Sequence, residues 1–268
     1  MHGLEEFSGS IPPDASAGPW YKELTRYHWF VLIVAALGWL FDTMDQQLFV
    51  LSRVDAMREL VGSKVTMTAQ PDWTEEQVVA EKAKLVKQVV AEYSGYATTI
   101  FLLGWATGGL FFGVLGDRIG RAKTMMLTIL IYSLCTGLSA LSTGFWDFAI
   151  YRFLTGLGVG GEFAVGVSLV AEVMPNRARP FALGLLQALS AIGNITAALT
   201  SMYLAHLEHG GAFKDLVIMG VAVKAWRIMF VIGILPAMLA IVIRRRLKEP
   251  ERWQHLSHEE RLAKKAGS

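Results

Sequence analysis

The sequence is poor in cysteine and in charge, and both shortages limit what the chain can be. Cys135 is its single cysteine among 268 residues, so no disulfide can form within the chain. Only 18% of the residues are charged, whereas soluble domains carry about 25%, and 53% are hydrophobic. No Asp, Glu, Lys or Arg occurs at 95–116 or at 124–145. Such runs cross about 30 Å of hydrocarbon as helices, so the sequence predicts an integral membrane protein.

Common enzyme motifs are also missing. The sequence has no His-Glu-x-x-His, no phosphate-binding loop and no nucleophile elbow, so we expect no enzyme. Gly156, Gly158 and Gly161 match a dinucleotide-binding pattern, but neither the strand nor the soluble helix that it needs is predicted. Gly156 and Gly160 instead predict close helix packing. We expect no cofactor and no metal site. We also expect no nucleic-acid partner, because the basic residues behind the net charge of +2 cluster at helix ends.

Six hydrophobic segments predict an all-α membrane protein with six transmembrane helices. Basic residues follow the second, fourth and sixth segments, and the positive-inside rule therefore places both termini in the cytoplasm, across an inner or plasma membrane. We expect a cytoplasmic segment at 1–28, the bundle at 29–243 and the start of a cytoplasmic linker at 244–268. The predicted helices are Trp29–Leu51, Gly95–Leu115, Thr124–Ser142, Trp146–Val170, Phe181–Ala205 and Gly220–Ile243.

An insertion at 52–94 separates the first two predicted helices, and we expect it on the extracytoplasmic side. Thr74 followed by Gln77 is a capping-box pattern. From Glu75 to Glu92 the apolar residues recur on one helical face, which predicts an amphipathic helix outside the membrane. This helix would rest on the bundle as a lid or spacer, or would bind a partner.

The first and fourth predicted spans contain candidate ionisable residues: Asp42 and Asp45 in the first, and Arg152 and Glu162 in the fourth. A charged side chain at mid-membrane costs about 2.5–3.5 kcal/mol on insertion scales, so each must face protein or water. With a rise of about 1.5 Å per residue, Asp45 and Arg152 both lie roughly 9 Å below the outer surface. We predict that these two residues pair and that all four serve proton coupling. A purely structural salt bridge is the alternative.

The charged turn at 113–123 carries the most specific pattern in the chain. Its matching positions are Gly113, Leu115, Asp117, Arg118, Gly120 and Arg121. The turn resembles the signature between the second and third helices of the major facilitator superfamily, with Ala122 where a base is usual. That resemblance implies half of a twelve-helix fold, built as two inverted three-helix repeats, in which helices three and six face lipid. It also implies a partner: a missing carboxyl-terminal six-helix half or a second copy of the chain.

The first and fifth helices resemble those of metabolite–proton symporters and sugar porters. Asp42 and Asp45 are similar to an Asp-Gly-x-Asp pattern of proton-coupled aromatic-acid symporters, with Thr43 replacing the glycine. Gln187 resembles a glutamine of sugar porters that hydrogen-bonds substrate. Hydrogen bonding between helices would explain such a buried amide equally well. The predicted substrate-binding residues are Gln46, Gln187 and Asn194.

Charged residues at the predicted cytoplasmic ends resemble the inner gate of the same families. The stretch 172–179 is similar to a motif after helix four, and 248–253 to a motif after helix six. Weak exposed ion pairs suit a gate that opens in every cycle, although the charges could serve membrane topology alone. The predicted gate comprises Gly113, Asp117, Arg118, Gly120, Arg121, Glu172, Arg179, Glu249 and Arg252.

These patterns together predict a secondary transporter that moves a small polar metabolite, an organic acid or a sugar, by proton symport and alternating access. Its partners would be the substrate, protons and the lipid bilayer. The alternative is a six-helix membrane scaffold, or an inactive half-transporter, that keeps the fold without transporting anything.

Overall fold

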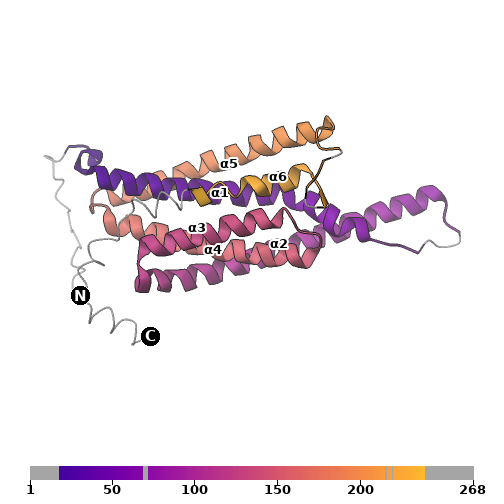
Figure 1. Ribbon diagram of the computed structural model, residues 1–268, viewed down its shortest axis with the longest axis horizontal. Helices are drawn as coiled ribbons and strands as arrows, with labels where there is room; N and C mark the ends of the chain where they lie inside the picture. The colour runs from indigo at the N-terminus through magenta and orange to yellow at the C-terminus, as the bar shows by residue number, and fades with distance from the viewer. Residues whose placement is uncertain (1–17, 69–71, 215, 219, 239–268) are drawn as a thin grey trace, which may run out of the picture.

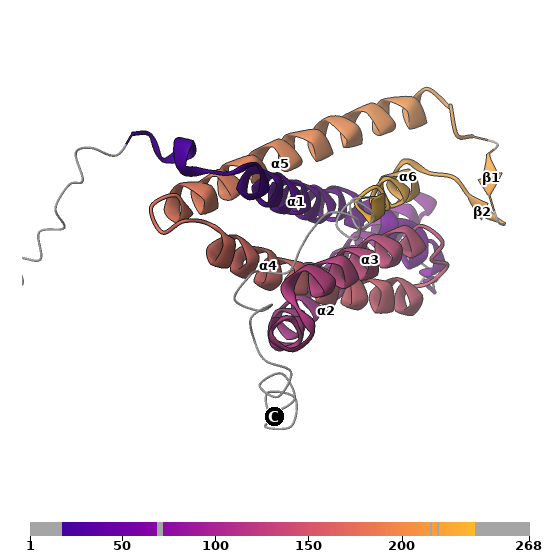
Figure 2. The same cartoon turned by 60° about the vertical axis from the view of Figure 1, so that its left-hand side comes forward.

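The computed structural model describes residues 18–68, 72–214, 216–218 and 220–238. Within these residues, five of the six predicted transmembrane helices are long and apolar enough to cross a membrane. They run along the long axis of the molecule, with α1 and α5 on one side and α2, α3 and α4 on the other, as Figure 1 and Figure 2 show. The helices are α1 (Arg26–Leu60), α2 (Glu75–Ile119), α3 (Arg121–Ser139), α4 (Phe145–Val173), α5 (Arg179–His209) and α6 (Ala225–Ile232), with short 3-10 turns at Trp20–Glu23 and Gly62–Lys64.

Helices of the first triplet pack against helices of the second. α2 packs along α4, and α1 packs along α5. This crosswise pairing is the arrangement expected of two inverted three-helix repeats. A Cβ at Gly108 would overlap the backbone of Leu157, and one at Gly160 would overlap the backbone of Trp105. The predicted role of glycine in bringing two helix backbones together is therefore found between α2 and α4.

The amphipathic helix predicted from Glu75 to Glu92 and the span predicted from Gly95 form one continuous helix. α1 continues to Leu60, and α2 runs unbroken from Glu75 through Gly95 to its end. One glycine costs only about 1 kcal/mol inside a helix, and no proline interrupts the segment. The capping box is confirmed, because Thr74 N–H donates to Gln77 Oε1 at 2.9 Å and Gln77 N–H donates back to Thr74 Oγ1 at 3.4 Å. The first turns of α2 therefore project beyond the bundle (Figure 1).

The sixth predicted helix begins later than expected. Gly220 lies in a tight turn with φ +79°, between the short antiparallel strands β1 (Val217–Ile218) and β2 (Val221–Ala222). α6 starts only at Ala225. Hydropathy alone cannot distinguish two apolar strands from an apolar helix. The chain forms a hairpin here because Gly220 can adopt the positive φ that the turn requires. The predicted end of this helix, the linker at 244–268 and most of the segment 1–28 lie outside the described residues.

The outer surface of the bundle is apolar. Leu110, Trp146 and Met202 are each at least 70% exposed, whereas Tyr132 and Phe230 in the core are fully buried. Broad apolar surfaces of this kind suit contact with acyl chains or with another membrane domain, not with water.

Candidate functional site

The four predicted ionisable residues lie together in the interior of the bundle, and we name them the charge centre. α1 contributes Asp42 and Asp45, and α4 contributes Arg152 and Glu162; none of the four is more than 4% exposed. The carboxyl groups of Asp42 and Glu162 lie close enough to interact with each other inside the bundle. Among the described residues, no three His, Cys, Asp or Glu side chains are grouped so as to hold a metal ion.

The hydrogen-bonded ion pair predicted between Asp45 and Arg152 is not formed. Both carboxylate oxygens of Asp45 are buried without a hydrogen-bond partner. Arg152 Nη2 instead donates to Ser139 Oγ at 2.7 Å and to Thr155 Oγ1 at 3.1 Å. The two charges still act on each other electrostatically. The two hydroxyls bind only Nη2, and Nε and Nη1 of Arg152 are buried without a hydrogen-bond partner.

α3 takes part in this centre, contrary to the expectation that it only faces lipid. One of its faces exposes Leu127 and Leu134, but the opposite face buries Tyr132, which interacts with Asp42. Sequence reasoning missed this tyrosine because it searched for charges alone. The hydroxyls of Thr128, Tyr132 and Ser139 recur at helical spacing, and that pattern could have revealed a polar inner face.

A hollow of about 410 Å³ lies beside the charge centre and is lined mainly by α1 and α5. It brings together the three predicted substrate-binding residues: Gln46 from α1 and Gln187 and Asn194 from α5. Asp42 lines the same hollow, although its carboxyl group also contacts Glu162 in the interior. The hollow thus connects amide groups, which can donate and accept hydrogen bonds, to a carboxyl group of the charge centre.

Aromatic side chains from α1, α2 and α4 also line this hollow. The rings of Trp39 and Phe163 lie 4.7 Å apart between centroids, and those of Trp105 and Phe163 lie 5.8 Å apart. All three residues line the hollow, and the Nε1–H of Trp39 has no hydrogen-bond partner. The hollow therefore offers flat apolar faces as well as amides. The sequence analysis did not single out these rings, because aromatic residues on apolar helices are common in any membrane protein.

Three of the predicted gate residues, Asp117, Arg121 and Glu172, lie in contact with one another, and we name this group the latch. Arg121 Nη2 lies 2.6 Å from Asp117 Oδ1 and 3.1 Å from Glu172 Oε1, so it joins the α2–α3 turn to the end of α4. Gly120 makes the turn with φ +107°, a conformation that other residues rarely adopt. The carbonyl of Gly113 accepts a further hydrogen bond from Arg121 at 3.4 Å.

The other predicted gate residues are not joined to the latch in the described part of the chain. Arg118 and Arg179 make no ion pair with another described residue. Glu249 and Arg252 lie outside the described residues, so their part in a gate stays a prediction.

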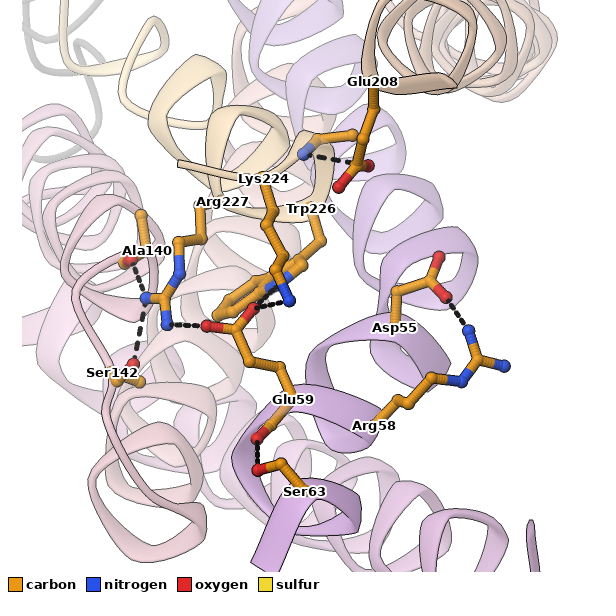
Figure 3. A network of polar contacts seen from close by, with 11 residues as sticks. Asp55, Arg58, Glu59, Ser63, Ala140, Ser142, Glu208, Lys224, Trp226 and Arg227 are labelled. Carbon is orange, nitrogen blue, oxygen red and sulfur yellow. Dashed lines mark hydrogen bonds and ion pairs between the residues drawn. The ribbon is translucent and has the colours of Figure 1, made fainter. Parts of the chain in front are cut away.

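A second polar network, which sequence reasoning missed, lies at the opposite end of the bundle, and we name it the clamp. Glu59 at the end of α1 accepts hydrogen bonds from Trp226 Nε1 and Arg227 Nη2, both at 2.8 Å, and lies 3.2 Å from Lys224 Nζ. Arg227 also donates to two carbonyl oxygens of the α3–α4 connection, including that of Ser142 at 2.9 Å. Figure 3 shows these groups converging from α1, α6 and the α3–α4 connection. The clamp therefore fixes the start of α6 to the rest of the bundle.

Comparisons with known proteins agree with this geometry. The family profile of the Major Facilitator Superfamily matches residues 63–267. The chain belongs to that superfamily. The niacin transporter NiaP of Acinetobacter baylyi is 30% identical over 84% of this chain and 41% of its own length, and the sialic acid transporter NanX of Escherichia coli is 28% identical over 88% and 48%. The proton:xylose symporter XylE shares the fold, with a TM-score of 0.66 and 18% identity over 89% of this chain and 49% of its own.

Membership of the Major Facilitator Superfamily settles the class of the protein. The chain is an integral membrane protein of a transporter family, it is not an enzyme, and its fold is that of the amino-terminal half of its relatives. It spans about half the length of the curated relatives that it matches.

Proposed function

We propose that this chain forms one wall of the transport path of a proton-coupled symporter for a small polar metabolite, an organic acid or a sugar. The observation that carries the proposal is the continuity between the hollow and the charge centre. Gln46, Gln187 and Asn194 line the same space as Asp42, and Asp42 contacts Glu162. Substrate binding and proton binding would therefore act on adjoining groups, which is the requirement for coupling the two.

The chemistry of the hollow narrows the substrate. Amide groups hydrogen-bond hydroxyl and carboxyl groups, while aromatic faces stack on flat rings or on the C–H face of a sugar ring. Among the lining residues that the structure describes there is no Lys or Arg, so this wall offers no fixed cation to a substrate carboxylate. A polar, ring-bearing metabolite fits best. The related transporters named for niacin and sialic acid, and the xylose symporter, handle compounds of that kind.

Alternating access would follow from a second bundle facing α1 and α5 across the hollow. A proton reaching Asp45 or the Asp42–Glu162 pair would change the charge of a buried site, and the two bundles would then rock to expose the hollow to the other side. The latch would close one side in one state and release it in the next. Its cytoplasmic location follows from the basic residues around it. A carboxyl-terminal half is the expected partner, and a second copy of the chain is the alternative.

Uptake by reconstituted vesicles tests the proposal. The full-length product of the reading frame that encodes this chain would be assayed with radiolabelled niacin, benzoate, sialic acid and xylose, with and without an inward proton gradient. We expect accumulation of at least one compound only with the gradient, and its loss in Asp45→Asn. Asp55→Asn is the matched control, because Asp55 is exposed and its ion pair among the described residues is with the exposed Arg58. Uptake that ignores the gradient would refute proton coupling, and no uptake of any compound would favour the scaffold alternative.

A further inference from the structure

The guanidinium group of Arg152 is enclosed by three aromatic rings, which we name the cage. Its carbon Cζ lies 4.6 Å from the ring centroid of Phe230, 5.5 Å from that of Phe49 and 5.6 Å from that of Phe148. The Arg152 side chain and the rings of Phe148 and Phe230 are fully buried. A cation near the face of an aromatic ring is attracted by the ring quadrupole, and the attraction is strongest where water is excluded. The cage thus partly replaces the hydration and the counter-charge that a buried arginine lacks.

The nearest ring comes from α6, which sequence reasoning assigned to the lipid side. α6 approaches both members of the expected ion pair. Phe230 lies over Arg152, and three residues later Gly233 lies against Asp45: a Cβ at Gly233 would stand 2.9 Å from Asp45 Oδ1 and would overlap Thr136. The helix therefore occupies the space beside both groups. Asp45 and Arg152 are held apart while each remains buried.

We propose that Phe230 is a positioning residue for proton coupling: it holds Arg152 in the cage, away from Asp45, in the state that this structure represents. This inference rests on the proposed function, because it assigns the cage to the proton cycle. The guanidinium group then has two alternative partners. With Asp45 neutral, the cage and the hydroxyls of Ser139 and Thr155 hold it; with Asp45 ionised, the carboxylate competes for it. The cage therefore sets how readily Arg152 leaves the rings and hydroxyls to pair with the ionised Asp45.

The charged and titratable groups around this pair are few. Asp45 and Cys135 interact electrostatically with Arg152, and Asp45 in turn interacts with Asp42 and Tyr132. Glu162 acts on Asp42 from α4. From α6, the described residues direct no charged group at Arg152, only the ring of Phe230. A change at Phe230 therefore alters the partner of the guanidinium group without adding or removing a titratable group.

The pH dependence of uptake tests the role of Phe230. In Phe230→Leu the apolar volume is largely kept but the ring is lost, so Arg152 pairs more readily with Asp45 and a higher proton concentration is needed to separate them. We expect the pH of half-maximal gradient-driven uptake to fall by about half to one unit. Phe230→Tyr keeps the ring face and should restore the wild-type profile. Phe112→Leu makes the same change in a buried ring of another cluster and should leave the midpoint unmoved.

A thermal-stability cycle in detergent needs no transport and separates failure of this inference from failure of the proposed function. Phe230→Leu should lower Tm more in the Asp45→Asn background than in the wild type, because only in the wild type can Asp45 become the new partner of Arg152. Phe112→Leu should lower Tm equally in both backgrounds. An equal loss of Tm for Phe230→Leu in the two backgrounds, or an unchanged pH midpoint of uptake, would contradict the proposed role of Phe230. If no compound is taken up but the stability cycle is non-additive, the cage stands and the transport proposal fails.

Discussion

The latch and the clamp both join helices with charged groups, but they lie at opposite ends of the bundle and in different environments. In the latch, the Arg121 side chain is 13% exposed, but its partners Asp117 and Glu172 are 64% and 30% exposed. In the clamp, Glu59 is 20% exposed and Arg227 only 7%. The latch connects the α2–α3 turn to α4 alone. The clamp joins three segments, because Arg227 at the start of α6 donates both to Glu59 of α1 and to two carbonyls of the α3–α4 connection.

Exposure decides what each network can do. Exposed ion pairs contribute about 0.2–1 kcal/mol and are weakened by salt, so the latch can open and close at little cost. Removal of one member of a buried, hydrogen-bonded pair costs about 3–5 kcal/mol, because the other member is left unpaired. The clamp is therefore a fixed support for α6, and the latch is suited to a moving gate. Four substitutions test this contrast.

The largest effect is expected from Arg227→Ala in the clamp. It removes the buried cation that donates to Glu59 and to the carbonyls of Ala140 and Ser142. We expect the free energy of unfolding, measured in mixed detergent micelles, to fall by about 3 kcal/mol. Arg58→Ala is the control, since Arg58 pairs with Asp55 at the exposed surface, and it should change stability by less than about 0.5 kcal/mol. Equal losses of unfolding free energy in Arg227→Ala and Arg58→Ala would show that the clamp is no stronger than an exposed ion pair.

Glu59→Gln should have the next largest effect. The amide keeps the size of the side chain and one acceptor oxygen, but it loses the charge that holds Lys224 and Arg227. We expect a loss of about 2 kcal/mol in the same unfolding assay, because hydrogen bonds to charged groups contribute about 1.5–3 kcal/mol. A loss as large as that of Arg227→Ala would mean that the charge, and not the convergence of hydrogen bonds, makes the clamp.

Trp226→Phe removes a single hydrogen bond from the clamp. The indole Nε1–H donates to Glu59 at 2.8 Å, and the phenylalanine ring can still pack near Phe148 and Phe230. One hydrogen bond contributes about 1 kcal/mol, so the loss of unfolding free energy should be close to that value. A much larger loss would show that the packing of the indole ring outweighs its hydrogen bond.

The smallest stability effect is expected in the latch, from Arg121→Ala. Its partners are exposed, so the free energy of unfolding should fall by no more than about 1 kcal/mol, and by still less in 1 M salt. The rate of uptake should change far more than the stability does, if the latch is a gate. A stability loss equal to that of Arg227→Ala would contradict the division of roles between the two ends.

The sequence predicted the latch but not the clamp, and the reason is physical. Asp117 and Arg121 lie four residues apart in one turn, so their pairing follows from local geometry, and a known motif marks them. Glu59 and Arg227 are 168 residues apart, and only the fold brings them together. In the same way the buried charges were found from hydropathy, since a charge in an apolar run is conspicuous. The rings around Arg152 were missed, because an aromatic residue in such a run is ordinary.

Helix existence was predictable and helix ends were not. Long apolar runs correctly predicted five membrane-crossing helices. Their ends were harder to predict, since α2 continues through Gly95 and α6 begins after a hairpin that hydropathy does not reveal. The expected Asp45–Arg152 pair shows the same limit, since equal depth in the membrane does not determine which partner a side chain selects.

The central claim is that the charge centre couples protons to substrate, and comparison of exchange with accumulation tests it most directly. In proteoliposomes, Asp45→Asn should still exchange labelled for unlabelled substrate across the membrane, because the hollow and its amides are intact. It should no longer accumulate substrate when an inward proton gradient is imposed, whereas the wild type does both. Accumulation by Asp45→Asn in proportion to the gradient, at the wild-type level, would contradict the account.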